Sequence, residues 1–97
     1  MELIHYLYSL LQNYFLYLLI MEKLINTILT RLYPDLEYHI EAGVWANYVY
    51  LDNVYRTYKP LSSHVLYSKG KYHEVNVGRI KSDLMNIGGL DFVRIIV

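Results

Sequence analysis

The first third of the chain follows a helical pattern of polar and apolar positions. Polar side chains fall on one third of the helix circumference at about 100° per residue, both before and after an apolar middle. Opposite them, apolar side chains recur every three or four residues, a spacing that packs one helix against another. This seam consists of Ile4, Leu7, Leu11, Tyr14, Leu18, Met21, Ile25, Ile28 and Leu32. The pattern predicts one continuous helix over residues 2–33.

Such a helix is long for a chain of 97 residues. At ~1.5 Å per residue it would measure about 48 Å, whereas a compact domain of this size has a radius of gyration of about 13 Å. Its apolar surface is too large to be buried against the remainder of one chain, so it must bend, enter a membrane or pack against another copy. We expect a homo-oligomer, most simply a dimer, with an interface built from Ile4, Leu7, Leu11, Tyr14, Leu18, Met21 and Ile25.

Membrane association is the alternative for this segment. No charged residue lies between Leu3 and Met21, a length near the ~20 residues that cross a bilayer. However, the Gln12-Asn13 pair would sit near the middle of the bilayer, and no Lys/Arg cluster flanks one side. A basic n-region and a small-residue cleavage site are missing, which disfavours a signal peptide. The absence of cysteine excludes disulfides and thiolate metal sites, so a cytoplasmic location is the default expectation.

After Pro34 the period changes from about 3.6 to 2, which indicates strands. We expect strands over 36–42, 44–51, 54–59, 64–68, 72–77 and 92–97, although the spacing in 44–58 also fits a helix. Lys69-Gly70-Lys71 predicts a hairpin turn. Helical spacing returns over 77–87, and Gly88-Gly89 provides its C-terminal stop.

These elements predict a single α+β domain over residues 1–97. Residues 1–33 form the long helix, and residues 34–97 form an antiparallel β-sheet of about five to six strands with a short second helix before the last strand. The last strand would be central in the sheet if both of its faces are covered.

Charge is distributed unevenly, although the formal net charge is zero. Residues 1–52 hold two basic and six acidic side chains, whereas residues 53–81 hold six basic and one acidic. Such asymmetry marks a surface for nucleic acid or for an acidic partner. It would equally allow the acidic half of one copy to meet the basic half of another.

The basic hairpin is the main candidate binding site. Cations there would neutralise phosphates, and tyrosines would stack on exposed bases. An acidic protein surface would use the same side chains, and lysines that only protect a sheet edge are the simpler alternative. The candidate residues are Arg56, Lys59, Tyr67, Lys69, Lys71, Tyr72, Arg79 and Lys81.

Enzymatic signals are weak, and we expect neither catalysis nor a cofactor. Glu37, His39 and Glu41 share one face of the first predicted strand, where they could recruit a divalent metal or form an ordinary solvated face. Pro34-Asp35 followed by Glu41 resembles the metal-dependent nucleases with a Pro-Asp…Asp/Glu-x-Lys signature. Gly43 stands where that signature has its lysine, so no residue role is carried over.

In overall style the chain resembles the small orphan proteins of viruses that infect hyperthermophilic archaea, and some bacteriophage proteins are similar too. The resemblance rests on the absence of cysteine, 12 tyrosines in 97 residues and many Ile, Leu and Val side chains. It implies a host-takeover, regulatory or virion-associated role inside the host cell, often as a dimer. We therefore expect a non-enzymatic binding protein that acts as a helix-mediated homo-oligomer. The alternatives are a nucleic-acid-binding protein and a membrane-associated protein.

Overall fold

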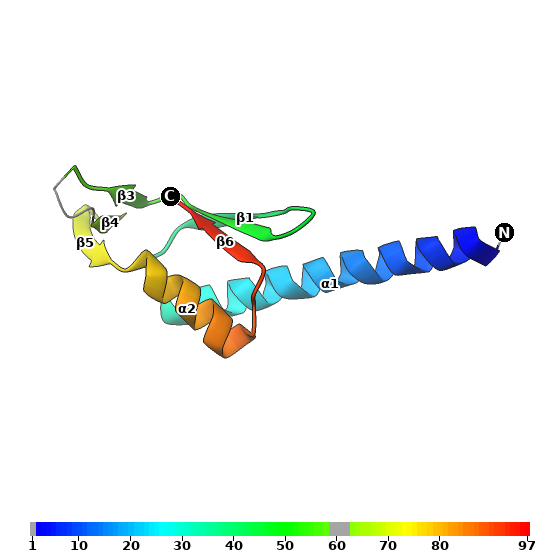
Figure 1. The fold of residues 1–97 in the computed structure, drawn as a ribbon. Coiled ribbons are helices and arrows are strands. Elements are labelled where there is room, and N and C mark those ends of the chain that lie inside the picture. The colour runs from blue at the N-terminus through cyan, green and yellow to red at the C-terminus, as the bar shows by residue number, and fades with distance from the viewer. Residues whose placement is uncertain (1, 59–62) are drawn as a thin grey trace.

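A computed structural model describes residues 2–58 and 63–97 of the chain. Within these ranges the chain forms an α+β fold, as the sequence predicts (Figure 1). The elements are α1 (Glu2–Leu32), β1 (Tyr38–Ala42), β2 (Asn47–Leu51), β3 (Val54–Arg56), β4 (His64–Ser68), β5 (Lys71–Val75), α2 (Val77–Gly88) and β6 (Val93–Ile96).

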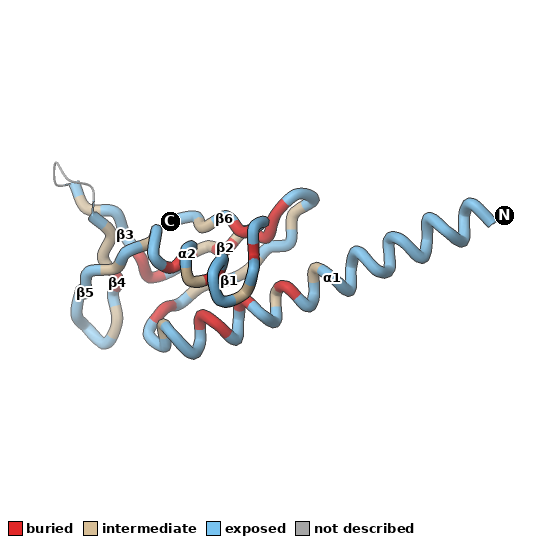
Figure 2. The backbone as a smooth tube through the Cα atoms, turned by 60° about the horizontal axis from the view of Figure 1, so that its bottom comes forward, coloured by how far each residue is buried: buried red, intermediate tan, exposed pale blue. Residues whose placement is uncertain are grey.

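Helix α1 is continuous over 31 residues, which confirms the prediction of a single long helix. Its C-terminal end packs on the rest of the chain through Met21, Ile25, Ile28 and Leu29. Its N-terminal half projects away from the body of the molecule (Figure 2). The molecule therefore measures 59 × 26 × 23 Å, with a radius of gyration of 16.6 Å, against about 13 Å for a compact domain of this length.

The strands form two sheets of three strands each, in the orders β1-β2-β6 and β3-β4-β5. The expectation of a single antiparallel sheet of five to six strands is wrong. In addition, β6 pairs with β2 in parallel and lies at the edge of its sheet, not at the centre. Figure 1 shows both helices on the same side of the β1-β2-β6 sheet.

Asn53 explains why the chain changes sheets between β2 and β3. Its side-chain nitrogen donates to the carbonyl oxygens of Asp35 (2.9 Å) and Tyr67 (3.0 Å), and its side-chain oxygen accepts from the Glu37 amide (2.9 Å). Its own carbonyl accepts from the Tyr67 amide. These contacts fix the bend at Asp52-Asn53 and join the two sheets at this point.

The two shorter predicted features, the hairpin and the second helix, are confirmed with small shifts of their bounds. Lys69 and Gly70 both have positive φ, 53° and 79°, as a two-residue type I′ hairpin turn requires. Helix α2 begins after Asn76, whose side chain accepts from the Arg79 amide, and ends at Gly89 in the left-handed region. Both caps satisfy backbone groups that a helix end otherwise leaves free.

The hydrophobic core lies between α1, α2 and the inner face of the β1-β2-β6 sheet. Its members come from elements distant in the sequence, and those fully enclosed include Ile25, Leu29, Val49, Ile80 and Leu84. The core therefore depends on the C-terminal end of α1, whereas the N-terminal half contributes almost nothing to it.

Candidate interaction surfaces

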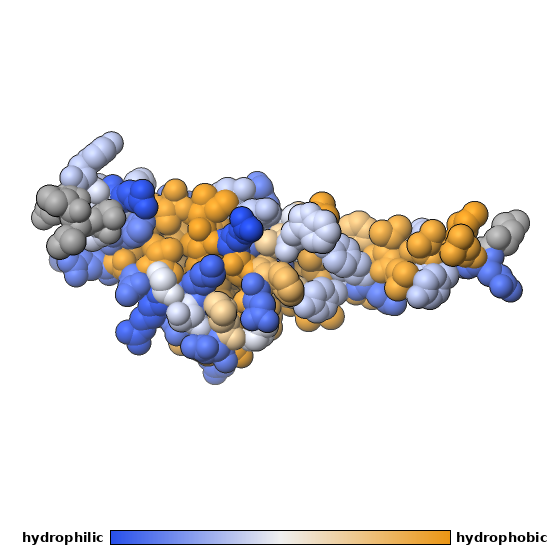
Figure 3. Space-filling model, in the orientation of Figure 1, coloured by the Kyte–Doolittle hydropathy of each residue, from blue (hydrophilic) through white to orange (hydrophobic). Residues whose placement is uncertain are grey.

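The first candidate surface is the arm, which we define as residues 2–20 of α1. Every side chain described in it is exposed except that of Leu18, which is half-buried. Ile4, Leu7 and Leu11 of the predicted seam are 67%, 51% and 56% exposed. Figure 3 shows apolar side chains along much of its length. The arm is thus an apolar helix that the other described residues leave largely uncovered.

The predicted oligomer seam divides into two parts. Met21 and Ile25 lie in the chain's own core, and the Tyr14 hydroxyl donates to the Val44 carbonyl of the same chain. The members that remain free for a partner are therefore Ile4, Leu7 and Leu11, with Tyr14 and Leu18 only partly free.

A second surface, the apolar notch, lies where the arm meets the turn between β1 and β2. It encloses about 210 Å³ and is lined by Tyr14, Tyr17, Leu18, Met21, Val44, Trp45, Ala46, Asn47 and Phe92. Trp45 is 85% exposed at its rim. Gly43 allows this tight turn, because a Cβ there would come within 2.8 Å of the Ala46 carbonyl oxygen.

The hairpin of β4 and β5 gathers part of the predicted basic site. Tyr67 and Tyr72 are cross-strand partners, with ring centroids 4.9 Å apart and both rings exposed. Lys69 lies in the turn and Lys71 directly follows it. However, the Lys69 ammonium is 3.7 Å from an Asp35 carboxylate oxygen, which offsets part of the positive charge.

The other predicted cations do not join this group. Arg56 pairs with His64, four residues from the hairpin end of β4, which is about 13 Å along the strand. Arg79 and Lys81 lie in α2, where a spacing of two residues turns their side chains to different sides of the helix. Lys59 lies outside the described residues. Of the predicted cations, Lys69 and Lys71 lie together at the hairpin tip, whereas Arg79 lines a neighbouring cleft with Asp35 and His73.

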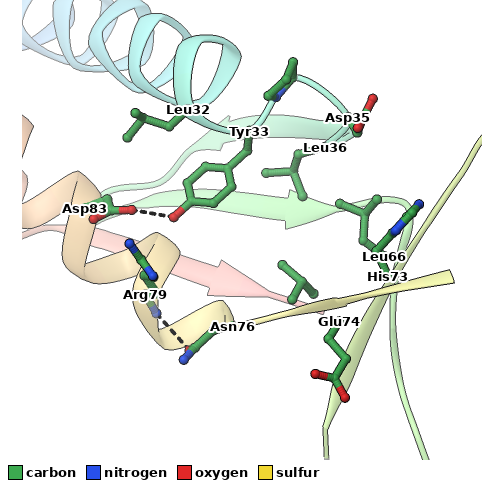
Figure 4. Close-up of a pocket in the computed structure, with 12 residues that line it drawn as sticks. Leu32, Tyr33, Asp35, Leu36, Leu66, His73, Glu74, Asn76, Arg79 and Asp83 are labelled. Atoms are coloured by element: carbon green, nitrogen blue, oxygen red, sulfur yellow. Dashed lines mark hydrogen bonds between the residues drawn. The ribbon is translucent and has the colours of Figure 1, made fainter.

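A third surface is a mainly apolar cleft of about 580 Å³ with polar groups on one side, between the end of α1, the β4–β5 hairpin and the start of α2 (Figure 4). Leu36, Leu66 and Val75 provide its apolar wall. On its polar side the Tyr33 hydroxyl donates to the Asp83 carboxylate. Burial, followed by this hydrogen bond, raises the pKa of Tyr33 to about 12, so the phenol stays protonated well above pH 10.

The candidate metal ligand His39 on β1 contacts Asp52 and Tyr50. The His39 ring is 2.9 Å from an Asp52 carboxylate oxygen and stacks on Tyr50, with centroids 4.8 Å apart. Within residues 2–58 and 63–97, no group of three or more His, Asp or Glu side chains is placed to hold a metal ion.

Neither helix of the described chain combines the length and hydropathy that a membrane-crossing helix requires. Comparisons with protein-family models, with curated proteins and with solved structures find no match to this chain.

The sequence did not single out the residues of the notch that lie outside α1. Val44 and Trp45 were expected in a strand, but they lie in the turn that precedes β2. The one available signal is Gly43, two residues before the only tryptophan of the chain, a combination that indicates a turn with an exposed aromatic tip.

Proposed function

We propose that this protein is a non-enzymatic binding protein that acts as a homo-oligomer assembled through the arm, most simply as a dimer. The observation that carries the proposal is the exposed seam Ile4, Leu7 and Leu11 on a helix that continues into the core. Monomeric proteins rarely expose a contiguous apolar patch of this extent without a partner.

The accessible surface of the chain supports the proposal. A compact monomer of 11.6 kDa exposes about 5,800 Å², whereas this chain exposes 7562 Å², an excess of about 1,700 Å². A standard protein–protein interface removes about 800 Å² from each partner. The excess is therefore sufficient for an interface of at least that size.

The proposal includes a macromolecular partner for the assembled protein. The compositional resemblance to small viral proteins fits a regulatory role inside a host cell. In that role the arm builds the assembly, and the surfaces of the body remain free for the partner.

The decisive experiment is a mass measurement on the full chain in the absence of detergent, by light scattering or sedimentation equilibrium. We expect at least twice the 11.6 kDa chain mass at micromolar concentration. A chain that stays monomeric under these conditions would overturn the proposal.

A pair of charge substitutions locates the interface. Leu7→Glu with Leu11→Glu places carboxylates in the seam, where burial of unpaired charge is costly, and should yield monomers that keep their secondary structure. The matched control is Ser9→Glu, on the opposite side of the same helix, which should leave the mass unchanged. If Ser9→Glu also dissociates the oligomer, the effect of Leu7→Glu with Leu11→Glu comes from added charge in general and not from the seam.

Nucleic-acid binding is the second candidate function, favoured by the adjacent exposed rings of Tyr67 and Tyr72 beside Lys69 and Lys71. Stacking on such rings contributes about 1–3 kcal/mol per base, and phosphate contacts weaken steeply with salt. Lys71→Glu should therefore weaken binding to DNA or RNA of any sequence, whereas Lys81→Glu on α2 should not. No electrophoretic shift at low salt with tens of micromolar protein would overturn this candidate.

A further inference from the structure

The exposed part of the seam is symmetric along the chain. Its members Ile4, Leu7, Leu11 and Tyr14 are separated by three, four and three residues, so the pattern reads identically in both directions about residue 9. Two antiparallel arms centred there would oppose Ile4 with Tyr14 and Leu7 with Leu11. Such alternating layers are how two antiparallel helices interlock their side chains.

The turn between β1 and β2 limits how far two arms can overlap. It partly covers Tyr14 and the seam beyond it, because the Tyr14 hydroxyl donates to the Val44 carbonyl and Leu18 and Met21 line the same notch as Trp45. A second arm that runs antiparallel would therefore end against this turn. Leu3 and Ile4 of that second arm would arrive at the notch.

We propose that two copies of this chain pair as an antiparallel, two-fold dimer in which the N-terminal turn of each arm covers the apolar notch of the other. This inference rests on the proposed homo-oligomer and specifies its geometry. The notch then has one occupant, Leu3 and Ile4 of the second copy. Trp45 and Phe92, 85% and 59% exposed in the single chain, become buried at the ends of the helix pair.

The position of the body excludes a parallel pair through the same seam. Met21 and Ile25 continue the seam on the same side of α1, and both face the chain's own core. Packed helices approach to about 8–10 Å, whereas the body extends the molecule to 26 × 23 Å across its long axis. In a parallel pair both bodies would occupy the same space, whereas an antiparallel pair places them at opposite ends.

The buried area is consistent with this arrangement. The excess surface of about 1,700 Å² per chain, relative to a compact monomer, is larger than the ~800 Å² that a standard interface removes from each partner, and most of the exposed large apolar side chains lie on the arm or around the notch. An isologous interface uses the same patches on both copies, so the second copy covers the seam face of the arm and the notch together.

Trp45 provides the first test, because it is the only tryptophan in the chain. On association of the full chain, its emission should shift to shorter wavelength and its quenching by acrylamide should fall. Ile4→Glu should reverse both changes by placing a charge against the notch, and His5→Glu, one residue along on the polar side, should preserve them.

Cysteine pairing provides the second test, since the natural chain has no cysteine. In an equimolar mixture of Leu7→Cys and Leu11→Cys chains, oxidation should yield predominantly mixed dimers, because a disulfide needs Cα atoms about 4.4–6.8 Å apart. Each variant alone should cross-link poorly.

The outcomes separate this inference from the proposed function. A monomeric chain overturns both. An oligomer in which Leu7→Cys cross-links to itself, or in which Trp45 stays quenchable, overturns the antiparallel pair and leaves the homo-oligomer intact. Protection of Trp45 that requires added phospholipid vesicles would place lipid in the notch and overturn the inference.

Discussion

Two buried asparagines, Asn53 and Asn47, differ in whether their side-chain amides form hydrogen bonds. Asn53 satisfies its side chain with three hydrogen bonds to backbone groups of separate segments. Asn47 is fully buried on β2, and neither of its side-chain polar atoms has a partner among the described residues. A made hydrogen bond contributes modestly to stability, whereas an unmade one in the interior is costly.

Replacing Asn53 should therefore be strongly destabilising. Asn53→Ala removes three hydrogen bonds and leaves two carbonyls and one amide without their partner, which should lower the free energy of unfolding by about 2–4 kcal/mol. Urea denaturation followed by circular dichroism measures the change. A loss below 1 kcal/mol would contradict the role of this side chain as the link between the two sheets.

Replacing Asn47 should stabilise the fold, in contrast to replacing Asn53. Asn47→Val removes the unpaired amide from a buried strand position and substitutes a residue that favours strands, which should raise the free energy of unfolding by about 1 kcal/mol. The same urea titration, run beside Asn53→Ala, checks it. Destabilisation by this change would indicate that the Asn47 amide is satisfied in solution.

Tyr33 couples stability to alkaline pH. Its folded-state pKa of about 12 exceeds the ordinary value of 10.0 because of burial and the Asp83 hydrogen bond. The stabilisation is fully present below pH 10 and is lost as the pH rises toward 12. Tyr33→Phe should cost about 1 kcal/mol at pH 7 and show a smaller loss of stability than the natural chain between pH 10 and 12. Urea titrations at several pH values measure the free energy of unfolding. An equal fall between pH 10 and 12 in Tyr33→Phe and in the natural chain would contradict this assignment.

At the scale of elements, the locally encoded features were predictable. The phase of polar residues across α1, the positive-φ turn at Lys69-Gly70 and the Gly89 cap of α2 each depend on residues close in sequence. The division into two sheets was not predictable, because it depends on the contacts of Asn53 with residues 14 to 18 positions away. The parallel pairing of β2 with β6 spans an even longer separation.

The candidate surfaces followed the same rule. The seam was visible as a helical period, but which of its members lie inside the chain's own core depends on the tertiary fold, which covers Met21 and Ile25. The prediction of one basic cluster rested on the assumption that residues close in sequence are close in space. The register of β3 against β4 instead separates Arg56 from the hairpin tip.

The arm and the body should behave as separable elements. A chain that begins at Met21 retains the buried α1 residues Met21, Ile25, Ile28 and Leu29, so we expect it to keep the β-sheet circular dichroism signal and a cooperative thermal transition. It should lose self-association, like the full chain with Leu7→Glu and Leu11→Glu. Complete unfolding of the shortened chain would show that residues 1–20 belong to the core.

At the scale of the whole molecule, the projecting arm would determine the distance between the two bodies of the proposed dimer. Each chain is 59 Å long, and overlap of residues 2–16 accounts for about 20 Å of shared helix. The proposed antiparallel pair would thus be a rod of about 100 Å with one body at each end.

That separation between bodies has a consequence for avidity. In the proposed dimer, two identical binding surfaces, one on each body of a stiff rod, would reinforce one another only on a ligand whose own sites repeat at a matching distance. A polymer or filament with such a repeat would be held by both ends at once, whereas an isolated copy of the same epitope would engage one end and leave quickly. The length of one uninterrupted helix would in this way select partners by their spacing.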